Sequence, residues 1–195
     1  MNKAIFLDRD GVINEMVYNQ DFGTVDSPLN LSEFKLIKGV AETIKILKAK
    51  GFLVVVVSNQ PAVAKGKMTL VFLNRITRKM KKELKIGGAN LDSVYYCLHH
   101  PDSGQVKIKK YLKNCDCRKP KPGLLLKAAK DLNIDLRKSF MFGDGLTDIE
   151  AGQAAGCKTI FLGSLKAYYV EVMNKKNIKP DFVAKNLLKA AKIIK

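Results

Sequence analysis

Residues 4–14 read AIFLDRDGVIN, and this stretch decides the fold class. The apolar run Ala4–Leu7 predicts a β-strand that delivers Asp8 and Asp10 into a turn. Gly11 supplies the backbone freedom that the turn needs. Carboxylates two residues apart face the same way and can bind Mg²⁺ through oxygen, after which one of them can attack phosphorus as a nucleophile. A calcium loop of the DxDG kind is the alternative, but that loop lies between helices, whereas this motif follows a strand.

The rest of the chain alternates between apolar runs and stretches of helical period. The expected strands are Ala4–Leu7, Phe52–Val57, Ser93–Leu98, Phe140–Phe142, Lys158–Phe161 and a possible edge strand, Phe182–Val183. The expected helices are Gly39–Lys50, Met68–Ile86, Pro122–Asn133, Leu146–Ala155 and Ala184–Ile194. The alternation predicts a doubly wound, Rossmann-like parallel sheet with helices on both faces, in a single domain over residues 1–195. Residues 15–33 form an irregular insert and residues 97–121 include a long loop, and long loops at that edge of a sheet are usually functional.

Polar residues follow the expected strands, at the edge where a parallel α/β sheet places its site. Ser58, with Asn59 and Gln60 after it, can hold phosphate oxygens without adding charge, although Ser-Asn is also ordinary turn chemistry. Asp144 in FGDGLTDIEAG can complete an oxygen shell for Mg²⁺. Asp148, one helical turn further, is either part of this shell or an acid favoured at a helix start by the helix dipole.

A basic segment, RKPKPG, precedes the third expected helix. Its cations are Arg118 and Lys119, and the prolines stiffen the backbone that carries them. A rigidly held positive charge offsets the negative charge that develops during phosphoryl transfer. The segment taken alone would be read as a solvated basic loop.

In this order, and at these strand ends, the four motifs resemble the haloacid dehalogenase superfamily of phosphohydrolases over residues 4–156. The resemblance implies that Asp8 is the nucleophile and that Asp10 is first the general acid and then the general base. It implies that Ser58 and Lys119 steady the transferring phosphoryl group. The implied magnesium ligands are Asp8, Asp10 and Asp144.

Cysteine and histidine residues in the long loop form a CxH…CxC pattern. Its members are Cys97, His99, Cys115 and Cys117. Three sulfurs and one imidazole are a common ligand set for a tetrahedral structural zinc ion. The alternative is a buried Cys97 with two free thiols. His100 is a further candidate ligand or lines the site, and Cys157 stands apart and is expected in the core.

The stretch YYCLHHP…CDCRKPKPG narrows the resemblance to a zinc-containing branch of D-glycero-D-manno-heptose 1,7-bisphosphate and histidinol-phosphate phosphatases. The branch implies no large cap domain, a zinc-stabilised loop, and substrate contacts from Asn59, Gln60, Arg118 and Lys119. Two departures bear on the substrate. The chain has Glu15–Asn19 where the heptose enzymes carry an Asp-His-Gly-Tyr-like segment, and Gly145 where they commonly have Lys.

The chain carries 35 Lys and Arg against 18 Asp and Glu, a formal charge of +17. This balance suits an anionic partner or reflects a solvated basic surface. No signal peptide is visible, and the longest apolar run is too short to cross a bilayer. We therefore expect a cytoplasmic protein without a membrane partner, in which disulfides are not expected.

These observations predict a Mg²⁺-dependent phosphomonoester hydrolase of carbohydrate metabolism that acts through an aspartyl-phosphate. The expected substrate is the 7-phosphate ester of heptose 1,7-bisphosphate, and the expected oligomeric state is a monomer. Histidinol phosphate is the alternative within the same chemistry. A 3′-phosphatase for nucleic-acid ends is the alternative from another class, but the chain lacks tryptophan, an RNP-like aromatic strand and a helix-turn-helix signature.

Overall fold

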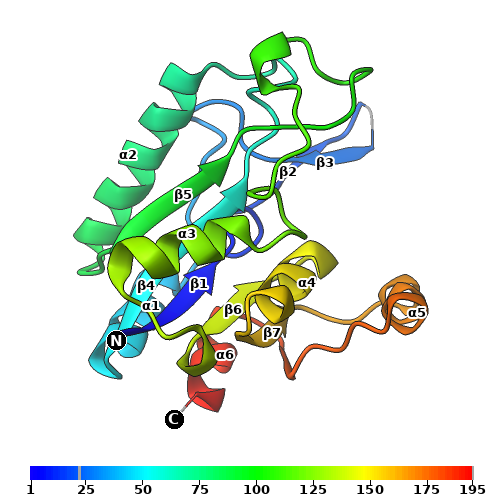
Figure 1. Ribbon diagram of the computed structural model, residues 1–195. Helices are drawn as coiled ribbons and strands as arrows, with labels where there is room; N and C mark the ends of the chain where they lie inside the picture. The colour runs from blue at the N-terminus through cyan, green and yellow to red at the C-terminus, as the bar shows by residue number, and fades with distance from the viewer. Residues whose placement is uncertain (22, 195) are drawn as a thin grey trace.

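A six-stranded parallel sheet organises the computed structural model, which describes residues 1–21 and 23–194. Its strand order is β5-β4-β1-β6-β7-β8. The strands are β1 (Lys3–Leu7), β4 (Phe52–Asn59), β5 (Ser93–Cys97), β6 (Phe140–Gly143), β7 (Lys158–Leu162) and β8 (Phe182–Ala184). The helices are α1 (Val40–Ala49), α2 (Leu70–Ile86), α3 (Gly123–Leu132), α4 (Leu146–Ala154), α5 (Ala167–Lys176) and α6 (Leu187–Ile193) (Figure 1).

Helices cover both faces of the sheet, because both faces of the central strands are apolar. In β1, Ile5 and Leu7 pack in the core that α1, α2 and α6 share, whereas Ala4 and Phe6 pack in the core that includes α3. Successive side chains of a strand point to opposite faces, so a strand buried on both faces needs a continuous apolar run. The expected doubly wound parallel sheet is therefore confirmed.

Most element ends differ from the expected ones by only one or two residues, and local hydrogen bonds explain the larger shifts. Helix α2 begins at Leu70 because the hydroxyl of Thr69 accepts a hydrogen bond from the Phe72 amide (3.2 Å). Helix α6 begins at Leu187 rather than Ala184, because Ala184 ends β8 and Asn186 caps the helix. Strand β4 continues through Asn59, so Ser58 lies within the strand rather than following it.

The insert at residues 15–33 is not wholly irregular. It contains an antiparallel hairpin of β2 (Val17–Asn19) and β3 (Thr24–Asp26), and Phe22, between them, lies outside the described residues. Most side chains of these strands are exposed, so the sequence carries no buried-and-exposed alternation that would predict them.

Helix α5 is also absent from the sequence prediction. Met173 is its only fully buried residue, so the apolar period that indicates a helix is weak. The helix ends at Asn177, which takes the left-handed conformation (φ 53°) common at helix ends. Among the described residues, no helix is long and apolar enough to span a lipid bilayer.

Candidate active site and metal centre

The carboxyl ends of β1 and β6 bring two aspartates together. Asp8 follows β1 directly, and its backbone amide donates a hydrogen bond to the Phe142 carbonyl oxygen of β6 (3.1 Å). Asp144 follows β6. Asp8, Asp144 and Asp148 each offer a carboxylate oxygen, and these oxygens lie within 4.8 Å of one another. The distant sequence motifs therefore meet at one edge of the sheet.

Gly11 makes room for this carboxylate cluster (Asp8, Asp144 and Asp148). Its backbone has a φ of +79°, and a Cβ atom built on it would lie 2.0 Å from Oδ2 of Asp144. Only a residue without a side chain allows the turn after β1 to approach Asp144 so closely.

The cluster has the electrostatics of a cation site. Burial, and then the charge of Asp8, raise the pKa of Asp144 to about 6. The pKa of the Asp148 carboxyl is also raised, chiefly by burial. Oxygen donors that are costly to ionise together fit a divalent cation such as Mg²⁺, which would stabilise their charged forms.

Lys119 lies buried beside the cluster. Its Nζ atom is 3.1 Å from Oδ1 of Asp8 and 2.5 Å from Oδ1 of Asp148, and it donates to the Val57 carbonyl oxygen at 2.9 Å. Burial is the largest influence and lowers the pKa of Lys119, but the charges of Asp148 and Asp8 together raise it above its ordinary value. The side chain is therefore a fixed cation at the nucleophile position.

Asp148 has two partners, and the second of them matches the expected role of an acid at a helix start. One carboxylate oxygen pairs with Lys119, and the other accepts a hydrogen bond from the Gly145 amide (3.1 Å) at the start of α4. It therefore anchors the lysine and also stabilises the helix start.

Asn59 holds the backbone of Lys119 rather than reaching outward. Its Nδ2 atom donates to the Lys119 carbonyl oxygen and its Oδ1 atom accepts from the Lys119 amide, both at 3.0 Å. These two hydrogen bonds join the end of β4 to the basic loop. The substrate contact expected of Asn59 stays a prediction.

Asp10 is not a member of the carboxylate cluster. Its Oδ1 atom accepts hydrogen bonds from Arg9 and Asn14, and its Oδ2 atom accepts from Arg9, Ser27 and Gln60. It is not among the carboxylates that could share an ion with Asp8. Protein donors thus occupy both of its side-chain oxygens, and the expected role of Asp10 as a magnesium ligand stays a prediction.

Gln60 is buried and also bonds inward. Its amide nitrogen donates to Oδ2 of Asp10 (2.7 Å) and to Oγ of Ser58 (3.1 Å), and its oxygen accepts from Arg9 (2.9 Å). Its amide thus supports Asp10 and Ser58, and the substrate contact expected of Gln60 stays a prediction. Arg118, in contrast, is half-buried, and its guanidinium donates to the His99 carbonyl oxygen (3.3 Å).

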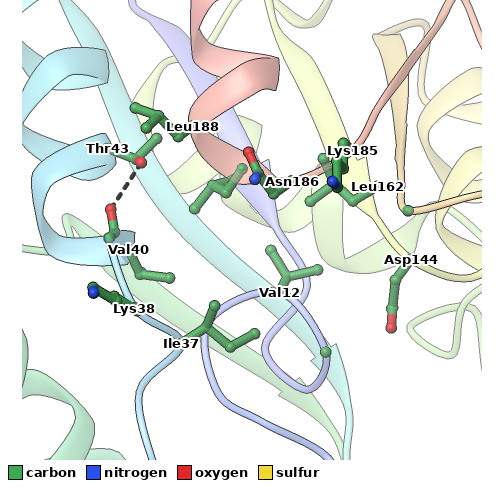
Figure 2. A pocket seen from close by; sticks show the side chains of 14 residues that line it. Val12, Ile37, Lys38, Val40, Thr43, Asp144, Leu162, Lys185, Asn186 and Leu188 are labelled. Atoms are coloured by element: carbon green, nitrogen blue, oxygen red, sulfur yellow. Dashed lines mark hydrogen bonds between the residues drawn. The ribbon is translucent and has the colours of Figure 1, made fainter.

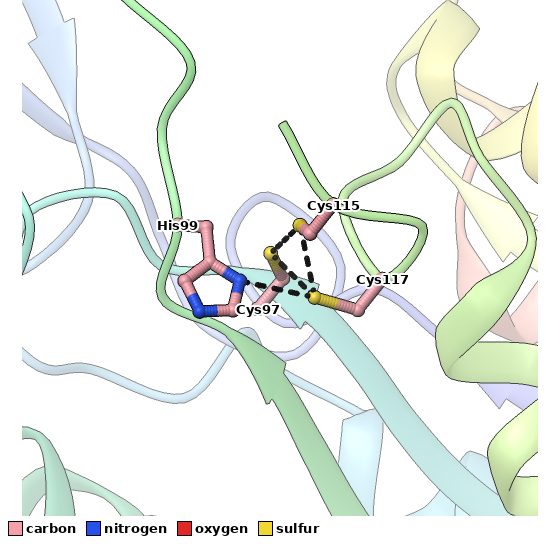
Figure 3. Close-up of side chains that lie close together, drawn as sticks. All are labelled: Cys97, His99, Cys115 and Cys117. Atoms are coloured by element: carbon pink, nitrogen blue, oxygen red, sulfur yellow. Dashed lines mark hydrogen bonds between the residues drawn. The ribbon is translucent and has the colours of Figure 1, made fainter. Parts of the chain in front are cut away.

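The cysteine and histidine residues of the long loop meet as a second cluster (Figure 3). Its members are Cys97, His99, Cys115 and Cys117, with their donor atoms within 4.8 Å of one another. The Sγ atoms of Cys97 and Cys117 are 3.1 Å apart, and Nδ1 of His99 is 3.4 Å from Sγ of Cys117. These sulfurs are too far apart for a disulfide and are free thiols.

The donor set of this second cluster fits zinc. Burial, followed by Cys117, raises the pKa of the Cys97 thiol well above its usual range, and a bound cation would reverse that effect by stabilising the thiolate. His100 lies outside the cluster, since its Nδ1 atom accepts from the Asp102 amide (3.2 Å). Cys157 is buried in the core, as expected.

Three polar residues around Asp10 were not singled out from the sequence: Arg9, Asn14 and Ser27. Arg9 is fully buried, which is unusual for a guanidinium. Its place between the two aspartates of the first motif was the available signal. Nothing local marked Ser27, which lies in the insert.

A cavity of about 450 Å³ borders the carboxylate cluster between α1 and α6 (Figure 2). Val12, Ile37 and Leu162 form part of its lining, and Lys38 and Lys185 add positive charge. Asp144 is the only member of the carboxylate cluster that lines it. The cavity is therefore a neighbour of the site rather than the space that the cluster encloses.

Comparisons with known proteins agree with this geometry. A family model described as HAD-hydrolase-like matches residues 116–190. The D-glycero-beta-D-manno-heptose-1,7-bisphosphate 7-phosphatase of Pasteurella multocida is 43% identical over 162 residues, which are 83% of this chain and 82% of that protein. The enzyme of the same name from Escherichia coli K12 is 42% identical over 156 residues, 80% and 76% of the two chains. This chain belongs to the haloacid dehalogenase superfamily.

Solved structures of the superfamily have the same fold. The D,D-heptose 1.7-bisphosphate phosphatase of B. bronchiseptica, complexed with magnesium and phosphate, has a TM-score of 0.77 and 28% identity, and covers 98% of this chain and 97% of its own. The Burkholderia thailandensis enzyme of that name has a TM-score of 0.64 and 23% identity, with coverage of 98% and 97%, and supports the fold alone. The chain is thus a haloacid dehalogenase phosphatase, and phosphatases of this superfamily use Mg²⁺.

Proposed function

We propose that this phosphatase removes the 7-phosphate of D-glycero-D-manno-heptose 1,7-bisphosphate through an aspartyl-phosphate on Asp8, with residues 1–195 acting as one catalytic domain. The contact that carries the proposal is the ion pair of buried Lys119 with Asp8, beside the carboxylates of Asp144 and Asp148. It sets a carboxylate nucleophile against a fixed cation at a site with the donors for Mg²⁺. The printed names of the relatives support the sugar bisphosphate as substrate.

In the first half-reaction, an oxygen of Asp8 attacks phosphorus and the bond from phosphorus to the sugar oxygen breaks. Asp10 gives its proton to the leaving oxygen. Lys119 offsets the charge on the phosphoryl oxygens, and the Ser58 hydroxyl holds one of them. In the second half-reaction Asp10 takes a proton from water, which attacks the aspartyl-phosphate and regenerates Asp8.

Two ions complete the proposal. Asp8 and Asp144 would hold Mg²⁺, which would supply charge neutralisation at the phosphoryl group. Cys97, His99, Cys115 and Cys117 would hold zinc and fix the loop that carries Arg118. Arg118 is proposed as a substrate contact, because it is half-buried on that loop next to Lys119. We infer a cytoplasmic location, in which the four cysteines would stay reduced.

A phosphate-release assay with Mg²⁺ tests the function. The substrates are heptose 1,7-bisphosphate, histidinol phosphate and a 3′-phosphorylated oligonucleotide, and we expect the highest kcat/KM for the heptose. A higher value for either other substrate would reassign the substrate and leave the chemistry in place.

Asp8→Asn tests the nucleophile. We expect kcat to fall by a factor of about 10³ or more with the fold and zinc content unchanged. Asp131→Asn is the matched control, since it neutralises an exposed carboxylate on α3 that pairs with Lys127. Substantial turnover by Asp8→Asn would exclude the covalent mechanism.

A further inference from the structure

Arg9 is the most deeply buried charged side chain near the site. Its exposed fraction is 0%, and its guanidinium lies over the ring of Tyr96, 5.6 Å from the centroid. A buried guanidinium is costly unless it is paired and hydrogen-bonded. Its charged partner is the adjacent Asp10, with Nη2 to Oδ1 at 2.9 Å.

The contacts between Arg9 and Asp10 fix an orientation. Nε donates to Oδ1 at 3.0 Å, and Nη2 reaches both Oδ1 (2.9 Å) and Oδ2 (3.1 Å). A planar guanidinium that grips both oxygens of a carboxylate sets its rotation as well as its place. The same Nη2 atom donates to Oε1 of Gln60, which in turn donates to Asp10 (2.7 Å). Arg9, Asp10 and Gln60 thus close a ring of hydrogen bonds.

Two further donors complete a cage around Asp10. Asn14 donates to Oδ1 (2.9 Å) from the same turn, and Ser27 donates to Oδ2 (3.0 Å) from the insert after β3. Arg9, Gln60 and Asn14 are buried, whereas the Ser27 contact is only partly buried. Ser27 is therefore the donor at the open side of the cage.

We propose that Arg9, with Gln60, is a positioning residue for the phosphatase reaction: it aims the carboxylate of Asp10 at the leaving oxygen. The inference rests on the proposed role of Asp10 as general acid and base. An orienting role matters because a displacement of a catalytic group by about 1 Å can cost about 10²-fold in rate. The backbone amide of Arg9 donates a hydrogen bond to Oδ1 of Asp8 (2.7 Å), whereas the hydrogen bonds of its guanidinium go to Asp10 and Gln60.

A double-mutant cycle tests the proposal, with Arg9→Met, Asp10→Asn and both together in the phosphate-release assay. We expect Arg9→Met to lower kcat about 10²-fold, and Asp10→Asn to lower it by about 10²–10⁴-fold. Because Arg9 acts through Asp10, adding Arg9→Met to Asp10→Asn should lower kcat less than about threefold further. Full multiplication of the two losses would overturn the proposal. Near-normal turnover by Asp10→Asn would instead overturn the role of Asp10 itself.

Binding of inorganic phosphate separates orientation from a general distortion of the site. We expect its inhibition constant with Mg²⁺ to be unchanged in Arg9→Met, since Asp8 and Lys119 stay in place. Phosphate binding that falls in step with kcat would contradict a positioning role. Arg137→Met is the matched control, because that arginine side chain is 86% exposed and pairs only with Asp135 among the described residues.

Two other variants test the same proposal if Arg9→Met does not fold. Arg9→Lys keeps the charge but loses the bidentate grip, and we expect an intermediate kcat with normal phosphate binding. Gln60→Leu opens the ring without leaving a buried charge unpaired, and we expect a loss of about 10-fold in kcat. Wild-type kcat in both variants would refute the inference.

Discussion

At the scale of single residues, the site depends on how closely the Gly11 turn approaches Asp144. A Cβ atom at Gly11 would overlap the carboxylate, at 2.0 Å from Oδ2. Gly156 has nearly the same backbone conformation (φ +82°), but nothing lies within 4 Å of its Cβ position. The two glycines separate the cost of the left-handed backbone from the cost of the contact.

Gly11→Ala should therefore weaken Mg²⁺ binding at least about tenfold and lower kcat, whereas Gly156→Ala should do neither. Both variants should lose about 1–2 kcal/mol of stability, because each places a side chain on a left-handed backbone. Calorimetric Mg²⁺ titration and thermal unfolding measure the two effects. Equal Mg²⁺ affinity in the two variants would show that Asp144 adapts to the added methyl group.

The raised pKa of Asp144, about 6, predicts a pH dependence in the metal-free protein. Burial favours the neutral carboxyl, so the folded state gains stability from this group as pH falls through 6 towards the ordinary value of 3.8, and loses it as pH rises. Magnesium needs the ionised form. Its apparent Kd should therefore rise by up to about tenfold per pH unit below 6, and calorimetry at several pH values measures this. A Kd that is flat in that range would contradict the shift.

At the scale of elements, the loop between β5 and α3 is held at two points. Asn59 binds the backbone of Lys119, and the second cluster gathers Cys115 and Cys117 against Cys97 at the end of β5. Arg118 and Lys119 follow Cys117 directly, so the cluster sets the path of the backbone into the site. Loss of the cluster should therefore loosen the cations without removing them.

Cys117→Ser should lose zinc and lower kcat/KM by about 10–100-fold, the usual effect of disturbing a group that supports a site. Cys157→Ser is the matched control, because Cys157 is buried in the core away from the cluster and should keep the zinc. Metal analysis and steady-state kinetics read the two effects. Full activity in zinc-free Cys117→Ser would mean that the Asn59 clamp alone positions Lys119.

At the scale of the whole molecule, the dominant electrostatic feature is the net charge of +17. Most of the described salt bridges are between partly exposed side chains, where ion pairs contribute little. Repulsion among unpaired lysines should therefore outweigh local attraction at low salt.

Sodium chloride should accordingly raise the unfolding temperature by a few degrees between about 10 mM and about 300 mM, as the Debye length shortens. Sucrose at equal osmolality is the uncharged control. Because sucrose does not screen charges, it should not reproduce the rise in unfolding temperature that salt produces at low concentration. A melting temperature that stays constant or falls with salt would show that specific ion pairs matter more than the net charge.

The fold was largely predictable because the buried residues of a helix or strand recur along the sequence with the period of that element. The continuous apolar run Phe52–Val57 and the shorter run before Asp8 predicted central strands, and the structure confirms them. Helix α5 and the β2–β3 hairpin were not predicted from the sequence, because few of their side chains are buried. A helix or strand whose side chains are mostly exposed has no regular spacing of apolar residues by which it could be predicted.

The sequence by itself determined the parallel sheet, the strand ends that carry Asp8 and Asp144, and the four donors of the cysteine and histidine cluster. Only the tertiary structure decided that Asp10 faces a cage of Arg9 and Gln60, and that Asn59 grips the backbone of Lys119. The physical reason is the sequence separation of the residues that interact. A strand and the residues at its end follow from neighbours in sequence, whereas a buried polar side chain takes whichever donor the packing of distant segments brings within about 3 Å.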